Sequence, residues 1–121
     1  MIRGIRGATT ITVDNAEAVF TATQQLAIEM ALQNDIAPDD VASVIISTTP
    51  DITSSFPAKA VRMLDGWNYV PVMCTHEMNV SESLPKCIRI MMHVNTDVNQ
   101  QDVVHIYLND AVTLRPDLVK K

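Results

Sequence analysis

Hydrophobic and polar residues follow two periodicities along this chain, and each periodicity predicts one kind of secondary structure. Short apolar or alternating runs, which are typical of β-strands, occupy residues 2–13, 41–48, 69–74, 87–95 and 103–108. Apolar residues at a helical spacing, which predict α-helices, occupy residues 16–33 and 57–65. The predicted order is therefore strand, helix, strand, helix and three further strands.

Residues that favour element ends stand beside both predicted helices. Asp14 is placed to cap the first helix, and Glu17 follows at the spacing of a capping box. Pro57 begins the second helix at the position that proline favours, and Gly66 follows as a left-handed terminator. In the first strand, Gly7 permits a bulge or a close approach of the backbone to a neighbouring segment.

This order predicts an α+β fold, with a mixed five-stranded sheet and both helices on one face. Two helices cover only one face of such a sheet, so the other face should be polar or covered by another copy of the chain. With two Phe, two Tyr and one Trp, a monomer would have a thin core, which favours oligomerisation. No repeat or composition break divides the chain, so we expect one domain spanning residues 1–121.

Alternation along the predicted strands places three polar residues on the face without helices. Arg89 points away from its apolar neighbours Ile88 and Ile90. Tyr107 in the last strand and Arg6 in the first strand also alternate with apolar or small neighbours, so the three side chains should share one surface. Guanidinium groups offer planar pairs of donors that fit carboxylates, which indicates an anion site. An ordinary ion pair is the more common role of a single strand arginine, and the pattern leaves that alternative open.

Charge and cysteine content narrow the function classes. The net charge of −5 and the pI near 4.9 argue against a nucleic-acid partner, because phosphate binding needs a basic face. No apolar run approaches the roughly 18 residues of a membrane span, and residues 1–6 lack the features of a secretion signal. We therefore expect a cytoplasmic protein with no membrane partner, in which Cys74 and Cys87 are reduced thiols.

Cys74, His76 and Glu77 form the densest group of potentially reactive side chains. Cys74 and His76 share a face of a strand, but the pattern identifies no third group that would orient the histidine for nucleophilic catalysis. A metal site is also weakly indicated, because no second cluster of ligands has a suitable spacing. A buried thiol and a hydrogen-bonded carboxylate are the more ordinary roles. Three glycines are too few for a phosphate-binding loop.

Five blocks of the sequence carry a resemblance to a known family. They are IRGIRGATT (residues 2–10), FPAKAVR (56–62), GW with YVPV (66–67 with 69–72), KCIR (86–89) and LRPDL (114–118). In order and spacing across essentially the whole chain, these blocks resemble the monofunctional AroH-type chorismate mutases. The resemblance implies a homotrimer similar to a pseudo-α/β barrel, with the sheets at its centre, the helices outside and active sites between neighbouring subunits.

The resemblance also implies a set of site residues. One subunit would supply Arg6, Val72, Met73, Cys74, Glu77, Arg89 and Tyr107. The neighbouring subunit would supply Phe56, Ala58, Lys59 and Arg62, and the tail would close the site with Leu114 and Arg115. The sequence departs from the family pattern at Met73, where a small hydroxyl residue is common, and in its short tail.

The reaction that the resemblance implies is the Claisen rearrangement of chorismate to prephenate, in phenylalanine and tyrosine biosynthesis. It is unimolecular and needs no metal or cofactor, so the site should hold the compact conformer of the substrate dianion beside a fixed cation. Arg89 would place its charge at the ether oxygen, Arg6 and Tyr107 would bind the side-chain carboxylate, and Glu77 with Cys74 would anchor the ring hydroxyl. Further contacts would come from a wall, Phe56, and from the cations Lys59, Arg62 and Arg115.

Two other function classes stay open at the level of sequence. One is a trimer that binds a carboxylate ligand without catalysis, and the other is a small trimeric hydrolase or deaminase with a similar cleft between subunits. An enzyme that transfers protons would lose activity across a pKa near neutrality, whereas the rearrangement should show a broad pH profile.

Overall fold

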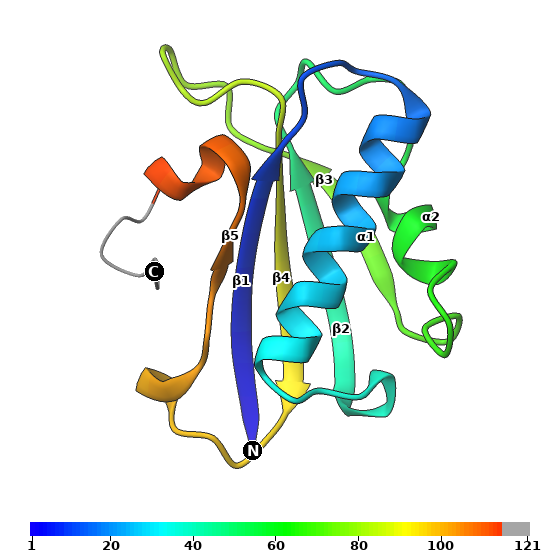
Figure 1. Cartoon of the computed structure of the whole chain (residues 1–121), viewed down its shortest axis with the longest axis vertical. Helices are drawn as coiled ribbons and strands as arrows, with labels where there is room; N and C mark the ends of the chain where they lie inside the picture. Colours follow the sequence, from blue (N-terminus) through cyan, green and yellow to red (C-terminus); the bar gives the residue numbers. More distant parts are fainter. Residues whose placement is uncertain (115–121) are drawn as a thin grey trace.

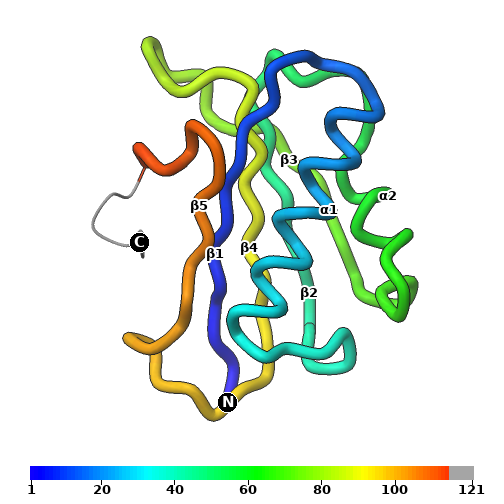
Figure 2. Tube along the Cα trace, viewed as in Figure 1, coloured from blue at the N-terminus to red at the C-terminus, as the bar shows by residue number. Residues whose placement is uncertain are grey.

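The chain forms a mixed β-sheet that carries both α-helices on the same face (Figures 1 and 2). The computed structural model describes residues 1–114. Its strands are β1 (Ile2–Thr10), β2 (Val41–Thr48), β3 (Val72–His76), β4 (Cys87–Asn95) and β5 (Ile106–Tyr107). Its α-helices are α1 (Ala16–Gln33) and α2 (Pro57–Arg62). The predicted α+β class, with two helices on a five-stranded sheet, is confirmed.

The side chains of the central strand β4 alternate between the two faces of the sheet. The strand order is β3-β2-β4-β1-β5, with β4 antiparallel to β1 and β2, and with β3 and β5 parallel to their neighbours. The apolar residues of β4 that alternate with Arg89 are at most 2% exposed and belong to the core beneath the helices. Arg89 points to the opposite side, as predicted. We call this side the open face, since neither α-helix covers it; it presents Gly4, Arg6, Ile45, Ser47, Arg89 and Met91.

Gly7 provides the close approach that the sequence predicts. A Cβ atom at this position would clash with the sulfur of Met30 and would lie 3.0 Å from Cδ1 of Leu26. Both side chains come from the buried face of α1. β1 pairs with β4 along its whole length, so β1 contains no bulge. Glycine is therefore required here because α1 lies directly on the strand.

Three predicted elements match the structure, and four are shorter or shifted. The bounds of α1, β2 and β4 agree with the prediction, whereas β1 ends at Thr10. α2 ends at Arg62 because the chain tightens there: the Leu64 N–H donates to the carbonyl of Val61, three residues back. Gly66 follows with φ of 84°, in the left-handed region expected of a terminator.

The third strand begins later than predicted because residues 67–70 form a turn. The Val70 N–H donates to the carbonyl of Trp67, and the side chain of Tyr69 is 91% exposed. β3 starts at Val72 and continues to His76, because its last residues pair with the end of β2. The β-branched and aromatic composition of residues 69–74 thus misled the prediction of the boundary.

The fifth strand is reduced to two residues because side chains take the place of a strand partner. The Asn34 side chain accepts from the Val104 N–H and donates to the Val104 carbonyl, each at 2.8 Å. The Arg6 N–H donates to Nδ1 of His105 at 2.9 Å. Backbone pairing between β1 and β5 is left to Ile106 and Tyr107.

The predicted cap of the first helix is wrong by one residue. Asn15 is the N-cap of α1, since its Oδ1 accepts from the Ala18 N–H at 2.8 Å. Asp14 instead binds the segment around Thr53.

Both cysteines, Cys74 and Cys87, are free thiols, as predicted. Within the described part of the chain, no helix is both long and apolar enough to cross a bilayer.

Candidate active site

A cavity of about 170 Å³ opens on the open face of the sheet, and we call it the arginine cavity. Its polar lining consists of Arg6, Ser47, Glu77, Arg89 and Tyr107. These residues come from four strands and from the position that follows β3. The structure therefore brings together Arg6, Arg89 and Tyr107, as strand alternation predicts, and it adds Glu77 to them.

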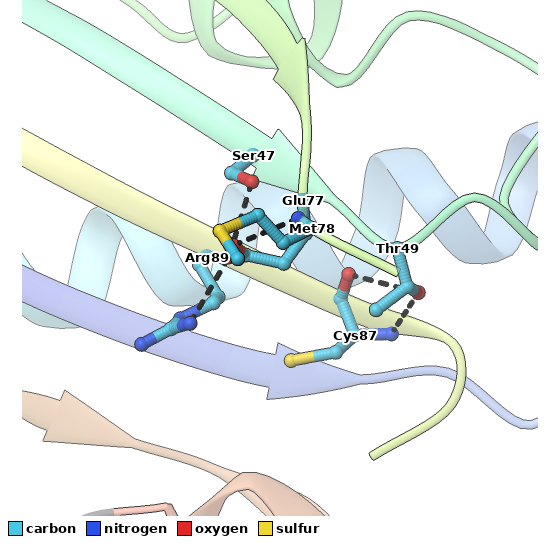
Figure 3. A network of polar contacts seen from close by, with 6 residues as sticks. All are labelled: Ser47, Thr49, Glu77, Met78, Cys87 and Arg89. Carbon is cyan, nitrogen blue, oxygen red and sulfur yellow. Dashed lines mark hydrogen bonds and ion pairs between the residues drawn. The ribbon is translucent and has the colours of Figure 1, made fainter. Parts of the chain in front are cut away.

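Arg89 and Glu77 form an ion pair across this cavity (Figure 3). Nη1 of Arg89 donates to Oε2 of Glu77 at 3.0 Å, and the Ser47 hydroxyl donates to the same oxygen at 3.3 Å. The backbone places Glu77 here, because its N–H donates to the carbonyl of Thr48 at 2.8 Å. Sequence reasoning did not identify Ser47, whose register beside Arg89 is visible only once β2 and β4 are paired.

The Glu77 carboxyl is held in its ionised form. Partial burial on its own would raise its pKa, but the hydrogen bond from the Met78 N–H, the charge of Arg89 and the hydrogen bonds from Arg89 and Ser47 outweigh it and lower the pKa. The side chain of Arg89 is 44% exposed and that of Glu77 is 31% exposed. The bond to Glu77 uses only one of the N–H groups of the Arg89 guanidinium, so the other N–H groups can bind a ligand.

Hydrogen bonds to Thr49 hold the start of β4, the strand that carries Arg89 (Figure 3). Oγ1 of Thr49 accepts from the Cys87 N–H at 2.9 Å, and the Thr49 N–H donates to the Cys87 carbonyl at 3.0 Å. Burial raises the pKa of the Cys87 thiol to about 11. Cys87 is therefore a neutral, structural thiol near neutral pH.

Tyr107 reaches the arginine cavity from a small apolar cluster. It packs with Ala8 and Ala111, and Leu114 packs against them from the edge of the cluster. Leu114 therefore packs against the cluster that contains the cavity residue Tyr107, and its expected role in closing the site stays a prediction. Arg115, the other residue expected to close the site, lies outside the described residues.

A second cavity, of about 660 Å³, lies on the helix side of the sheet beside β3, and we call it the Phe56 cavity. Its lining includes six of the expected site residues: Phe56, Ala58, Lys59, Arg62, Val72 and Cys74. Phe56 is 77% exposed at its rim. The cations Lys59 and Arg62 give this cavity a positive field that suits an anionic ligand.

The expected grouping of Val72 and Cys74 with Arg89 differs from what the structure shows. Both residues face the helices and line the Phe56 cavity, where Sγ of Cys74 accepts from the Ala58 N–H at 3.3 Å. In one chain, Cys74 therefore lies apart from the arginine cavity that Glu77 lines. The physical reason is the strand period of two, which turns Cys74 to the face opposite Arg89.

Met73, between them, points to the open face and is 73% exposed. It pairs with Ile45, which pairs in turn with Met91, so three apolar residues form a row that leads across the sheet to the register position of Arg6. Ile45 and Met91 also line the arginine cavity. An exposed apolar row of this kind is characteristic of a surface that another protein chain covers.

The weak nucleophile and metal interpretations of Cys74 and His76 gain no support from the geometry. Burial raises the pKa of the Cys74 thiol, and the hydrogen bond from Ala58 and the charge of Arg62 do not reverse this, so the thiolate is disfavoured. Among residues 1–114, no three His, Cys, Asp or Glu side chains gather as metal ligands.

Comparison with known proteins identifies the family. The sequence model of the family "Chorismate mutase type I" matches residues 2–118. The chain belongs to the type I chorismate mutase family. It is 52% identical to chorismate mutase AroH of Bacillus subtilis (strain 168), over 98% of this chain and 93% of that protein. It is 45% identical to chorismate mutase AroH of Thermus thermophilus, over 98% of this chain and 97% of that protein.

The fold of this chain agrees with that of a chorismate mutase whose structure has been solved. A chorismate mutase from Clostridium thermocellum superposes with a TM-score of 0.88 and 45% sequence identity. The match covers 91% of this chain and 97% of the other chain. The chorismate mutase resemblance drawn from the sequence blocks is thereby confirmed.

Proposed function

We propose that this chain catalyses the rearrangement of chorismate to prephenate, as a homotrimer with one active site at each subunit interface. The observation that carries the proposal is the arginine cavity, in which Arg6, Arg89, Tyr107 and Glu77 converge on the open face of a type I chorismate mutase chain. Two guanidinium groups suit a substrate that carries two carboxylates. The free thiols Cys74 and Cys87 fit the reducing cytoplasm, where we propose that the enzyme acts.

The mechanism follows from where the fixed charge lies. As the ether C–O bond breaks, negative charge develops on its oxygen, and Arg89 provides a preorganised cation beside that atom. Its charge stabilises the transition state more than the ground state, which raises the rate. Arg6 and Tyr107 hold the side-chain carboxylate, so that the reacting ends of the substrate stay in the compact, chair-like conformer.

Glu77 has two tasks in this proposal. It fixes the position of Arg89 through their 3.0 Å ion pair, and its remaining acceptor capacity anchors the ring hydroxyl of the substrate. No described residue of the arginine cavity needs to act as nucleophile, proton donor or metal ligand. The protein contributes conformational restraint and a fixed field.

The cavity dimensions support a site shared between subunits. At about 170 Å³, the arginine cavity is smaller than the roughly 300–1,000 Å³ of typical ligand pockets. The positive Phe56 cavity, with Lys59 and Arg62, lies on the other face of the same chain. We propose that the Phe56 cavity of one subunit meets the arginine cavity of its neighbour, and that the apolar row on the open face is buried in this contact. Val72 and Cys74, which line the Phe56 cavity, then reach the site from the same subunit as Phe56, whereas Met73 lies on the open face that carries the arginine cavity.

The deciding experiment mixes purified protein with chorismate in the presence of a chelator and follows the loss of chorismate absorbance. We expect conversion at an enzymatic rate, with prephenate as the product by NMR. Analytical ultracentrifugation of the same sample should give the mass of a trimer. Chorismate that binds and stays unchanged would overturn the proposal and would indicate a non-catalytic carboxylate-binding trimer.

A further inference from the structure

Asp14 fastens the segment that leads into Phe56. Its Oδ2 accepts from the Thr53 N–H at 2.9 Å and from the Thr53 hydroxyl at 3.1 Å. Its Oδ1 accepts from the Ser54 N–H at 3.3 Å. One carboxylate between β1 and α1 thus binds three donors that lie 39 and 40 positions further along the chain.

This carboxylate is not engaged in helix capping, because Asn15 caps α1. Within residues 1–114, its hydrogen-bond partners are Thr53 and Ser54, which precede Phe56 by three and two positions. The hydrogen bond from the Thr53 backbone, followed by those from Ser54 and the Thr53 hydroxyl, outweighs slight desolvation and lowers the pKa of Asp14. Asp14 is therefore ionised near neutral pH, with acceptor oxygens only.

The side chain of Phe56 is 77% exposed, so few contacts within residues 1–114 hold it. Its position therefore depends on the backbone that leads into α2, of which Phe56 is the N-cap. The segment before it, residues 53–55, also lines a cavity of about 500 Å³ that shares Phe56 and Cys74 with the Phe56 cavity. A shift of residues 53 and 54 would therefore move the wall formed by Phe56 against the cations of α2.

We propose that Asp14 is a positioning residue for the Phe56 side of the active site. It acts through the segment 53–56 and touches no reacting atom. The inference rests on the proposed function, since it assigns this wall to substrate binding. Because the wall contributes to binding in the ground state and in the transition state alike, loss of the clamp raises KM more than it lowers kcat.

The test compares Asp14→Ala and Asp14→Asn with the wild type. Asp14→Ala removes all three acceptor bonds, and we expect KM for chorismate to rise about fivefold while kcat stays within about twofold. Asp14→Asn retains one amide oxygen but points an N–H₂ group at another donor, so its KM should be intermediate. Asp39→Ala is the matched control, because Asp39 is also an acidic residue at the start of a helical element, the 3₁₀ helix Pro38–Asp40, and lines none of these cavities.

Hydrogen exchange measured by mass spectrometry supplies a readout that does not depend on turnover. In Asp14→Ala, the amides of residues 53 and 54 should exchange about tenfold faster, with the core strand β4 unchanged. Thr53→Val, which removes only the hydroxyl bond, provides a milder variant if Asp14→Ala does not fold, and it should show a smaller effect in the same direction.

The outcomes separate the two proposals. A wild type that does not convert chorismate overturns the proposed function, and the exchange rates then decide on their own whether Asp14 holds the segment. A wild type that converts chorismate, with an unchanged KM in Asp14→Ala, overturns the positioning role. Unchanged exchange at residues 53 and 54 overturns it as well.

Discussion

Nη1 of Arg89 lies 3.0 Å from Oε2 of Glu77, so the cation and the carboxylate that face the arginine cavity hold each other in place. The pair is partly exposed, and its net contribution to stability is therefore small, about 0–1 kcal/mol for pairs of this kind. Its value is geometric. Glu77 restricts a long, flexible side chain to one orientation before any substrate arrives, which is what electrostatic preorganisation requires.

Replacing Arg89 by glutamine should abolish most of the activity. The change removes the charge beside the ether oxygen, and we expect a loss of about 4 kcal/mol or more of transition-state stabilisation, judged from the effect of a single oxyanion-hole donor. Steady-state kinetics with chorismate measures this loss, and circular dichroism checks the fold. Arg89→Lys should also fail, because a single ammonium cannot reproduce the planar fork of donors.

Arg3→Gln is the matched control for the Arg89 variants. Arg3 also lies in a strand of the sheet, but its Nε donates to the carbonyl of Val98 and it does not line the arginine cavity. Its removal should leave kcat/KM within about twofold of the wild type. Retention of more than about a tenth of wild-type turnover by Arg89→Gln would refute the central role of this cation.

Glu77→Gln should separate catalysis from stability. The amide removes the charge that orients Arg89, so kcat/KM should fall by at least about tenfold. The free energy of unfolding should change by less than about 1 kcal/mol, because the pair is partly exposed. Kinetics and urea denaturation of the same preparation measure the two quantities. A variant that loses stability and activity in proportion would show that Glu77 has a structural role only.

Activity should be nearly independent of pH across the neutral range. Among the described residues, the arginine cavity is lined by no histidine, the side chain whose ordinary charge change falls near neutral pH. The pKa of Glu77 is lowered in the folded protein, so its ion pair is intact at neutral pH and is lost only as the pH falls through that lowered value.

A pH profile of kcat/KM from about pH 5 to 9 tests this expectation, with thermal melts at each pH to exclude unfolding. Activity should fall on acidification only when the pH drops below about 4.3, the ordinary pKa of a glutamate side chain. A single inflection near neutrality would point instead to a proton-transferring group and would favour the hydrolase or deaminase interpretation.

The sequence predicted those parts of the fold that local periodicity determines. The alternation along β4 placed Arg89 on the open face correctly, because burial on one face and exposure on the other leave a period of two in the sequence. The start of β5 was not predictable in this way. There the side chains of Asn34 and His105, remote in sequence from their partners, take the hydrogen bonds that a longer strand would have made.

The candidate site was only partly predictable for the same reason. Arg6, Arg89 and Tyr107 could be placed on one surface by alternation, but the register of β2 beside β4, which brings in Ser47, leaves no mark in one strand alone. The resemblance assigned Cys74 to the same subunit as Arg89, and this assignment took no account of the face of the sheet on which each side chain lies. In one chain, Cys74 lines the Phe56 cavity and not the arginine cavity.

Gly7→Ala should destabilise the fold through its contact with α1. The added methyl group would collide with Met30 and Leu26, which are fully buried, and such overpacking costs about 1–3 kcal/mol. Met30→Ala alone should cost about 2–5 kcal/mol by opening a cavity. The double variant should be more stable than the sum of the two losses predicts, because the new methyl group occupies space that Met30 vacates. Urea denaturation measures all three, and strict additivity would contradict the packing described for Gly7.

Two variants that are each inactive should restore activity when they assemble together. Arg89→Gln disables the arginine cavity, and the double change Lys59→Glu/Arg62→Glu gives the Phe56 cavity a charge that repels the substrate dianion. Both cavities are partly exposed, so neither change should prevent folding.

In a cyclic trimer whose sites join the arginine cavity of one chain to the Phe56 cavity of the next, random mixing leaves about a quarter of the sites with both halves intact. Refolding an equimolar mixture and measuring turnover should therefore give about a quarter of the wild-type rate, while each variant refolded alone stays inactive. If each chain supplied a whole site by itself, the mixture would stay as inactive as its components.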